Sequence, residues 1–233
     1  ILLINSANAL QVDFLKNNEY DIDAALWIGD VGISGINAVA EILTGKVNPS
    51  GSLVDTYCYD NLSAPAMWNF TPTTYEGYVE GGDVPAKAKS YMIYQEGIYV
   101  GYKYYETRYF DTVMGQGNAA STVGSSTGSA WNYDDEVTYP FGYGLSYTTF
   151  EQTLDNLNVD LENETVTANV TVKNTGSVAG KDVVQLYVSL PYTDYDKEHG
   201  VEKAAIQLLD YGKTAELAPG ASETVTITAD MQN

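Results

Sequence analysis

The stretch Ala24-Ala-Leu-Trp-Ile-Gly-Asp-Val-Gly-Ile-Ser-Gly35 decides the fold of the first half of the chain. Its first five residues form an apolar run without polar alternation, which is typical of a strand buried on both faces of a parallel sheet. After the glycine-rich loop, apolar residues from Ile36 to Leu43 recur at helical spacing, and Gly45 is a stop signal. A strand, a glycine-rich loop and a helix in this order predict an α/β domain.

The flanking segments extend this prediction in both directions. Residues 1–4 are a second apolar run and predict a second buried strand, and Asn8 is a candidate N-cap for a helix over 10–15. Residues 48–51 predict a turn and residues 53–59 an extended run. A parallel sheet of so few strands is not stable alone. We therefore expect a partial α/β sandwich domain, whose other strands lie outside these residues.

The middle of the chain carries weaker signals. Residues 65–85 have no clear period and predict a long loop. Residues 91–105 are rich in tyrosine and predict one or two strands. Within an insertion near 111–136, residues 115–130 are mostly Gly, Ser, Thr and Ala, with too little apolar area to order themselves. We expect this stretch to be a mobile surface loop.

From Leu154 onward the apolar residues alternate with polar ones at a period of two, which predicts strands with one buried face. The clearest runs are 166–172, 184–188 and 225–229. Their spacing and the turn residues between them predict an immunoglobulin-like or fibronectin type III-like β-sandwich, with a final strand beyond Asn233. The predicted fold class is α/β plus all-β. We place the partial α/β domain at 1–147 and the β-sandwich at 148–233.

Composition excludes several classes of function. The 233 residues carry 31 acidic and 11 basic side chains, a formal charge of −20, which repels nucleic acid and anionic lipid. A membrane span needs about 20 consecutive apolar residues, and no run in the sequence approaches that length. One cysteine, Cys58, and one histidine, His199, cannot form a His/Cys metal site. We therefore expect no nucleic acid, no membrane and no metal.

Trp27 and Asp30 are the candidate substrate-binding residues. They lie at the carboxyl end of a predicted parallel strand, where α/β sheets bind ligands. The alternative is that Trp27 belongs to the core and Asp30 makes hydrogen bonds within its own loop. The glycines at 29, 32 and 35 do not have the spacing of a dinucleotide-binding loop, so no cofactor is predicted.

Three other residues have reactive side chains, but a structural role explains each of them more simply than a catalytic one. Glu96 lies in an aromatic setting, yet acid/base work needs a second carboxylate, so an ion pair with Lys103 or Arg108 is favoured. Cys58 has no nearby histidine to activate it and predicts an inert core thiol. His199 lies in a polar stretch and predicts a solvated side chain.

Three segments in this order resemble the C-terminal part of glycoside hydrolase family 3, the β-glucosidase and β-xylosidase family. They are the stretch from Ala24 to Asn48-Pro-Ser-Gly51, the stretch Tyr94-Gln-Glu-Gly-Ile-Tyr-Val-Gly-Tyr-Lys-Tyr-Tyr105, and Tyr139-Pro-Phe-Gly-Tyr-Gly-Leu-Ser-Tyr147 with the β-module that follows it. The resemblance covers nearly the whole chain apart from the insertion.

The resemblance implies a modular, retaining glycosidase that cleaves terminal β-linked sugars. Such an enzyme has a barrel domain with an aspartate nucleophile, an α/β sandwich domain whose loop supplies an acid/base glutamate, and a fibronectin-like module. Neither carboxylate has a counterpart in this sequence, so no catalytic residue is assigned. The implied partners are a β-linked oligosaccharide or glycoside and the remainder of the enzyme. The alternative is a non-catalytic carbohydrate-binding or cell-surface interaction module.

Overall fold

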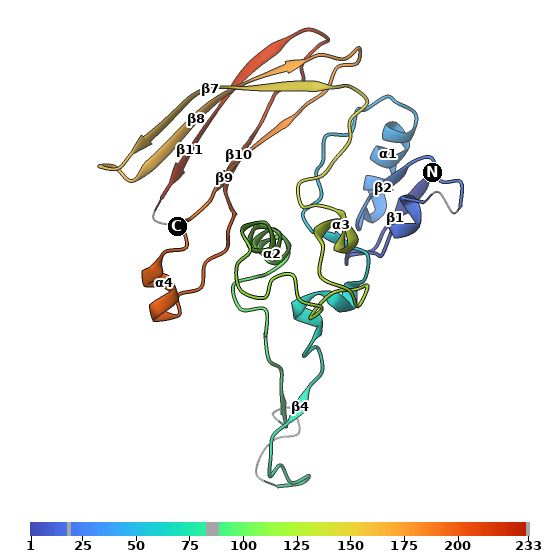
Figure 1. Ribbon diagram of the computed structural model, residues 1–233. Helices are drawn as coiled ribbons and strands as arrows, with labels where there is room; N and C mark the ends of the chain where they lie inside the picture. The colour runs from blue at the N-terminus through green and yellow to red at the C-terminus, as the bar shows by residue number, and fades with distance from the viewer. Residues whose placement is uncertain (18–19, 83–88, 232–233) are drawn as a thin grey trace.

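The computed structural model describes residues 1–17, 20–82 and 89–231. Near the N-terminus, β1 (Leu2–Ile4) pairs with β2 (Ala25–Trp27) in parallel, with Leu2 opposite Ala25. Helix α1 (Gly32–Leu43) follows β2 and lies beside this pair (Figure 1). The parallel pair and its helix confirm the α/β prediction for this region. In the described residues, no helix combines the length and apolar character needed to span a membrane.

The strand pair is covered on one side only. Ile4 is buried, together with Val12 and Tyr57, in a small apolar cluster. By contrast, Leu3 is 39% exposed, and Ile33 on α1 is fully exposed. None of the described residues forms a layer over the second face. This exposure agrees with the expectation that the other strands of the sheet lie outside these residues.

Three local predictions in this region need correction. The predicted helix over 10–15 is only a 3-10 turn, η1 (Asp13–Leu15), and no side chain caps it. Helix α1 begins at Gly32, earlier than the predicted Ile36, although it ends before Gly45 as expected. The predicted extended run 53–59 is regular only in β3 (Tyr57–Cys58), which pairs with β6 (Val137–Tyr139).

The prediction of strands over 91–105 is wrong beyond the first residue. The structure has β5 (Ser90–Tyr91), an irregular stretch and then helix α2 (Tyr102–Met114). Gly115 ends the helix in the left-handed conformation, at φ 65°. Tyrosine favours strands by propensity alone, but helical spacing places Tyr105 in the core while its neighbours stay partly exposed.

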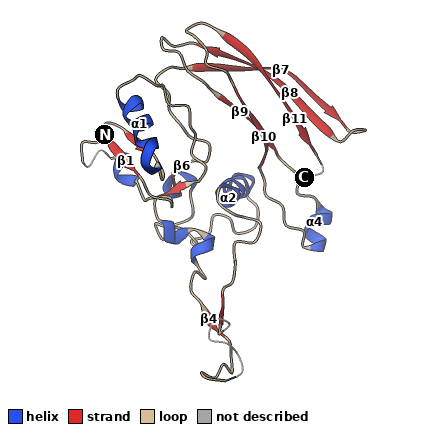
Figure 2. Ribbon diagram, turned by 180° about the vertical axis from the view of Figure 1, so that it is seen from behind, coloured by secondary structure: helices blue, strands red, loops and turns tan. Residues whose placement is uncertain are grey.

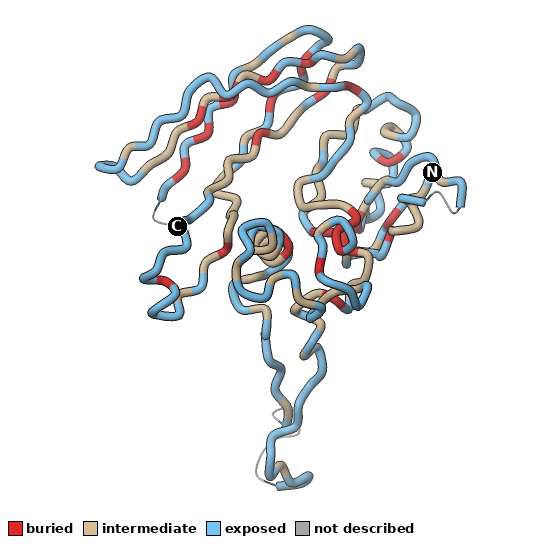
Figure 3. Tube along the Cα trace, in the orientation of Figure 1, coloured by how far each residue is buried: buried red, intermediate tan, exposed pale blue. Residues whose placement is uncertain are grey.

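The region predicted as a long loop extends away from the body of the protein (Figures 1 and 3). It contains one short 3-10 turn, η3 (Pro65–Met67), and one short strand, β4 (Thr73–Thr74), and a second 3-10 turn, η2 (Asn61–Ser63), precedes it. Strand β4 pairs with β5, and the end of the predicted loop at Pro85 lies outside the described residues. The lack of extended regular structure in the described part agrees with the prediction.

The Gly/Ser-rich stretch 115–130 forms neither helix nor strand, as predicted, but it has ordering contacts that its composition did not indicate. The Arg108 guanidinium donates to the carbonyls of Ala119 and Ser121 at 2.8 and 3.0 Å. The fully buried Glu136, in α3 (Tyr133–Glu136), accepts from the Ser126 amide at 2.8 Å. Neighbouring segments thus supply the contacts that the stretch itself lacks.

The C-terminal half is a two-layer β-sandwich, as its alternating pattern predicted (Figure 2). One sheet has the order β11-β8-β7, and the other pairs β10 with β9. Their inner faces meet in a cluster centred on Val172 and Ile227. The described elements are β7 (Phe150–Asp160), β8 (Thr165–Asn174), β9 (Val183–Val188), α4 (Asp194–His199), β10 (Gln207–Lys213) and β11 (Ser222–Asp230).

Asn48 connects the α/β region to the β-sandwich. Its side-chain oxygen accepts from the Ser146 hydroxyl at 2.9 Å and from the Tyr147 amide at 2.8 Å. Its side-chain nitrogen donates to the Ala179 carbonyl at 3.0 Å. One asparagine therefore holds together the Asn-Pro-Ser-Gly turn, the Tyr-Gly-Leu-Ser stretch and the loop between β8 and β9.

The close packing of the Asn-Pro-Ser-Gly turn against the Tyr-Gly-Leu-Ser stretch also requires a glycine at position 144. A β-carbon there would lie 2.5 Å from the Gly51 carbonyl oxygen, and the backbone of the turn cannot move away without disturbing the Asn48 contacts. We expect Gly144→Ala to lower the free energy of unfolding by about 1–3 kcal/mol. Chemical denaturation measures this loss. The matched control is Gly51→Ala, whose β-carbon meets nothing within 4 Å. Equal denaturation midpoints for the two variants would contradict this packing.

Candidate functional site

Trp27 and Asp30 lie together at the carboxyl end of β2, where the sequence placed them. The Trp27 indole N–H donates to the Ser6 carbonyl at 2.9 Å, and a β-carbon on Gly29 would touch the indole ring at 3.4 Å. The Asp30 carboxylate accepts from the Gly32 amide at 3.3 Å, at the start of α1. These contacts fix the loop, while Trp27 keeps 39% of its surface exposed.

This loop does not hold a catalytic pair. The hydrogen bonds of Trp27 and Asp30 stay within the loop and its neighbour strand, and among the described residues no second carboxylate contacts Asp30. Retaining glycosidases need two carboxyl groups about 5–5.5 Å apart. The described ranges also contain no group of three or more His, Cys, Asp or Glu side chains placed to hold a metal ion. Among the described residues, the loop therefore presents one carboxylate, Asp30, beside a partly exposed indole.

A second candidate site is a pocket of about 430 Å³ beside α2. Three segments far apart in sequence form its walls: α2 with the residues before it, the stretch 116–123, and the connection between β9 and β10. Its lining combines aromatic side chains with polar ones, namely Tyr99, Tyr104 and Tyr192 with Thr107, Arg108, Asp111, Gln116 and Asn118. An adjoining hollow of about 250 Å³ shares Tyr99, Tyr104 and Arg108 and adds Trp68, Gln95 and Glu96.

Arg108, the only arginine in the sequence, forms part of both hollows. Besides its bonds to two carbonyls, it donates to the Tyr104 hydroxyl at 2.6 Å, and its guanidinium lies 4.9 Å from the Trp131 ring centroid. A guanidinium has five N–H groups, so two of them have no hydrogen-bond partner among the described residues. In the described part of the chain no carboxylate lies within ion-pair distance of Arg108.

Two carboxylates lie in or beside the pocket: Asp111 lines it, and Glu202 is bound to the lining residue Tyr99. The Tyr99 hydroxyl donates to the Glu202 carboxylate, a contact that joins the residues before α2 to the connection between β9 and β10. Burial, reinforced by the charge of Glu202, raises the pKa of the Asp111 carboxyl above its usual range. The pocket lining therefore combines a carboxylate acceptor, Asp111, with the guanidinium donors of Arg108, both on α2.

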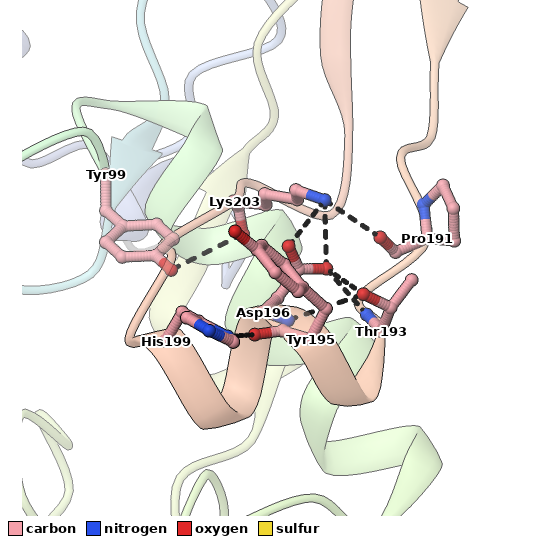
Figure 4. Close-up of polar contacts among 7 residues, drawn as sticks. All are labelled: Tyr99, Pro191, Thr193, Tyr195, Asp196, His199 and Lys203. Carbon is pink, nitrogen blue, oxygen red and sulfur yellow. Dashed lines mark hydrogen bonds and ion pairs between the residues drawn. The ribbon is translucent and has the colours of Figure 1, made fainter.

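Helix α4 stabilises the connection that carries Tyr192 (Figure 4). Thr193 and Asp196 form a capping box, with the Thr193 amide donating to the Asp196 carboxylate at 2.7 Å. The Lys203 ammonium binds the same carboxylate at 2.8 Å, and the Asp196 side chain is only 4% exposed. These contacts close the connection into a compact loop beside Tyr99.

This arrangement predicts an acid-sensitive loop. The Lys203 ammonium, then the Thr193 amide and hydroxyl, lower the pKa of Asp196 from 3.8 to about 2. Because the folded state binds this proton less tightly than the unfolded state, Asp196 stabilises the fold above pH 3.8, and that stability is lost as the pH falls through about 2. We expect thermal unfolding of Asp196→Asn to depend less on pH across this window than that of the wild type.

The matched control for this experiment is Asp194→Asn. Asp194 lies in the same helix and pairs with Lys197, but its side chain is 94% exposed, so the pair contributes little. The control should keep the wild-type pH dependence. Identical pH profiles for Asp196→Asn and Asp194→Asn would contradict the assigned role of Asp196.

The remaining candidates have different outcomes. The predicted ion pair of Glu96 with Lys103 or Arg108 is absent among the described contacts, because Arg108 is engaged by carbonyls and Tyr104. Cys58 is buried as predicted, and burial raises the pKa of its thiol, which keeps it protonated. His199 is exposed, with its ring stacked 4.0 Å from that of Tyr195.

Sequence reasoning missed the pocket. Tyr104 and Arg108 are four residues apart, which places them on one face of a helix, but the strand prediction for 91–105 concealed this spacing. Tyr192 is contributed from the β-sandwich half and carries no local signal. The one available clue was the single arginine of the chain within an aromatic run.

Comparison with known proteins identifies both halves. The glycosyl hydrolase family 3 C-terminal domain matches residues 1–102, and a fibronectin type III-like domain matches residues 182–233. The chain is 34% identical over 227 residues to a beta-glucosidase of Ruminococcus albus, covering 97% of this chain and 19% of the relative. It is 35% identical over 247 residues to beta-glucosidase A of Butyrivibrio fibrisolvens, covering 100% of this chain and 24% of the relative.

The structural comparison agrees. Beta-glucosidase 3B of Thermotoga neapolitana, solved in complex with glucose, superposes with a TM-score of 0.68 at 31% identity, over 98% of this chain and 25% of that one. The chain thus spans about a fifth to a quarter of the length of the relatives it matches. With two domain matches in the family's order and relatives aligned along nearly its full length, the chain belongs to glycoside hydrolase family 3.

Proposed function

We propose that this chain is the non-barrel portion of a retaining, β-glucosidase-like enzyme that cleaves terminal β-linked sugars. The main support is that beta-glucosidases align with 97–100% of this chain, while the chain covers only 19–24% of their length. Its own residues contribute scaffold and loops, and both catalytic carboxylates come from the remainder of the enzyme. We further propose a partial α/β sandwich domain over 1–147 and a fibronectin-like module over 148–233.

In this proposal the loop that follows β2 lies at the rim of the substrate site. Trp27 offers a partly exposed aromatic face to a sugar ring, and Asp30 offers a carboxylate to its hydroxyl groups. Neither residue takes part in proton transfer or nucleophilic attack. Their effect falls on substrate affinity: we expect Asp30→Asn in the full-length enzyme to raise KM for a β-glucoside with a smaller change in kcat.

The apolar face of α1 and β1 supports the proposed partner, the rest of the enzyme. Ile1, Leu3, Ile33 and Ile36 are exposed on or beside these elements, at 72, 39, 100 and 51%. A parallel pair with an apolar, uncovered face is stable only when further layers cover it. We propose that the missing strands and helices of the α/β domain cover this face.

A paired substitution in the full-length protein tests the proposal. If Ile33 is also exposed in the full-length protein, Ile33→Asp leaves its stability unchanged. If other layers cover this face, the substitution buries a charge and destabilises the protein. We expect it to lower both the unfolding temperature and the hydrolysis of aryl β-glucosides. The control is Leu161→Asp at the tip of the turn between β7 and β8, 79% exposed. Equal behaviour of the two variants, or no β-glucoside hydrolysis by the full-length protein, would refute the proposal.

A further inference from the structure

We propose that the pocket beside α2, lined by Tyr99, Arg108, Asp111 and Tyr192, is a second carbohydrate site that binds one neutral sugar ring. It lies on different elements from the loop that follows β2. The inference goes beyond the proposed function and does not depend on it, because binding in this pocket requires no hydrolysis.

The size and lining of the pocket define the ligand. About 430 Å³ lies within the range of roughly 300–1,000 Å³ that is usual for small-molecule sites. Three tyrosine side chains offer flat apolar faces to the C–H surfaces of a ring, and Gln116 and Asn118 offer amide donors and acceptors to its hydroxyl groups. A pocket that is both aromatic and rich in hydrogen-bonding groups suits a polyhydroxylated ring better than an apolar molecule.

The charges define the ligand further. Asp111 lines the pocket, and Glu202 lies at its rim, bound to the Tyr99 hydroxyl. These carboxylates, within a chain of net charge −20, repel phosphate and uronate groups. They accept hydrogen bonds readily from hydroxyl groups, which a neutral sugar supplies in several directions. The pocket therefore selects a neutral ring over an anionic one.

Arg108 provides the complementary donors. Its three described hydrogen bonds hold the guanidinium rigidly, and its two free N–H groups have no carboxylate partner among the described residues. A cation held in place by carbonyls and an aromatic ring is preorganised to donate to ligand oxygens. Acceptors from Asp111 and donors from Arg108 lie one helical turn apart on α2, and a ring hydroxyl can use both.

Hydrogen exchange read by mass spectrometry of the full-length protein tests this site, because peptides locate binding within the chain. With D-glucose at its dissociation constant, exchange through local opening of residues 115–123 should slow about twofold, and further at higher concentration. Sorbitol at equal concentrations controls for general stabilisation by polyols. Equal slowing with glucose and sorbitol, or none with either, overturns the proposal.

Two variants assign the effect to the pocket. Tyr192→Ala removes one aromatic wall, and Asp111→Asn keeps the shape but removes the charged acceptor. Both should abolish most of the glucose-dependent slowing while exchange elsewhere stays unchanged, which shows that the variants are folded. Tyr211→Ala, a tyrosine on β10 that is 64% exposed and outside the pocket, should respond like the wild type. Slowing that persists in both pocket variants places the sugar elsewhere and overturns the assignment.

Discussion

Replacing Asn174 by alanine is expected to unfold the β-sandwich, because it removes a buried side chain that joins four partners. The side-chain oxygen of Asn174 accepts from the Thr148 hydroxyl at 2.8 Å and the Gly176 amide at 3.0 Å. Its nitrogen donates to the carbonyls of Val178 and Leu217 at 2.8 and 2.9 Å. The residue is fully buried at the end of β8, so no water replaces these partners.

The magnitude follows from the groups left behind. Each buried polar group that loses its partner lowers the free energy of unfolding by about 1–3 kcal/mol. Asn174→Ala leaves several such groups without a partner at once. That loss is comparable with the whole stability of a domain, about 5–15 kcal/mol. Urea denaturation followed by circular dichroism measures it. The matched control is Asn158→Ala on β7, an exposed position where a change of no more than about 0.5 kcal/mol is expected. Similar denaturation midpoints for both variants would contradict the role of Asn174.

The β-sandwich was predictable because its signal is local and periodic. The alternating residues 166–172 and 225–229 lie in β8 and β11, and their apolar members face the core. The same was true of β1, β2 and α1, where apolar runs and a glycine-rich loop follow one another directly. In these elements the residues that form the pattern also form the structure.

The central region was less predictable because distant contacts decide it. Tyrosine propensity favoured strands over 91–105, whereas packing of Tyr105 against Cys58 and Val137 selects helix α2. The Gly/Ser-rich stretch is held by Arg108 and Glu136 from outside it. The pocket was not predictable for the same reason, because Tyr192 lines it from the distant β9–β10 connection.

The second large effect concerns catalysis: the 233-residue chain by itself should hydrolyse no β-glucoside. Retaining hydrolysis requires two carboxyl groups about 5–5.5 Å apart, one as nucleophile and one as acid/base. Asp30 contacts only its own loop, and Glu96 lines a hollow beside Arg108. In the proposed function neither residue is catalytic, and the remainder of the full-length enzyme supplies both carboxylates.

The measurement that tests this most directly is hydrolysis of an aryl β-glucoside by the purified chain and by the full-length protein, assayed side by side at equal molar concentration. We predict steady turnover by the full-length protein and none above the buffer rate by the chain. Turnover by the chain that disappears in Asp30→Asn or in Glu96→Gln would contradict this prediction and place the catalytic centre within these residues.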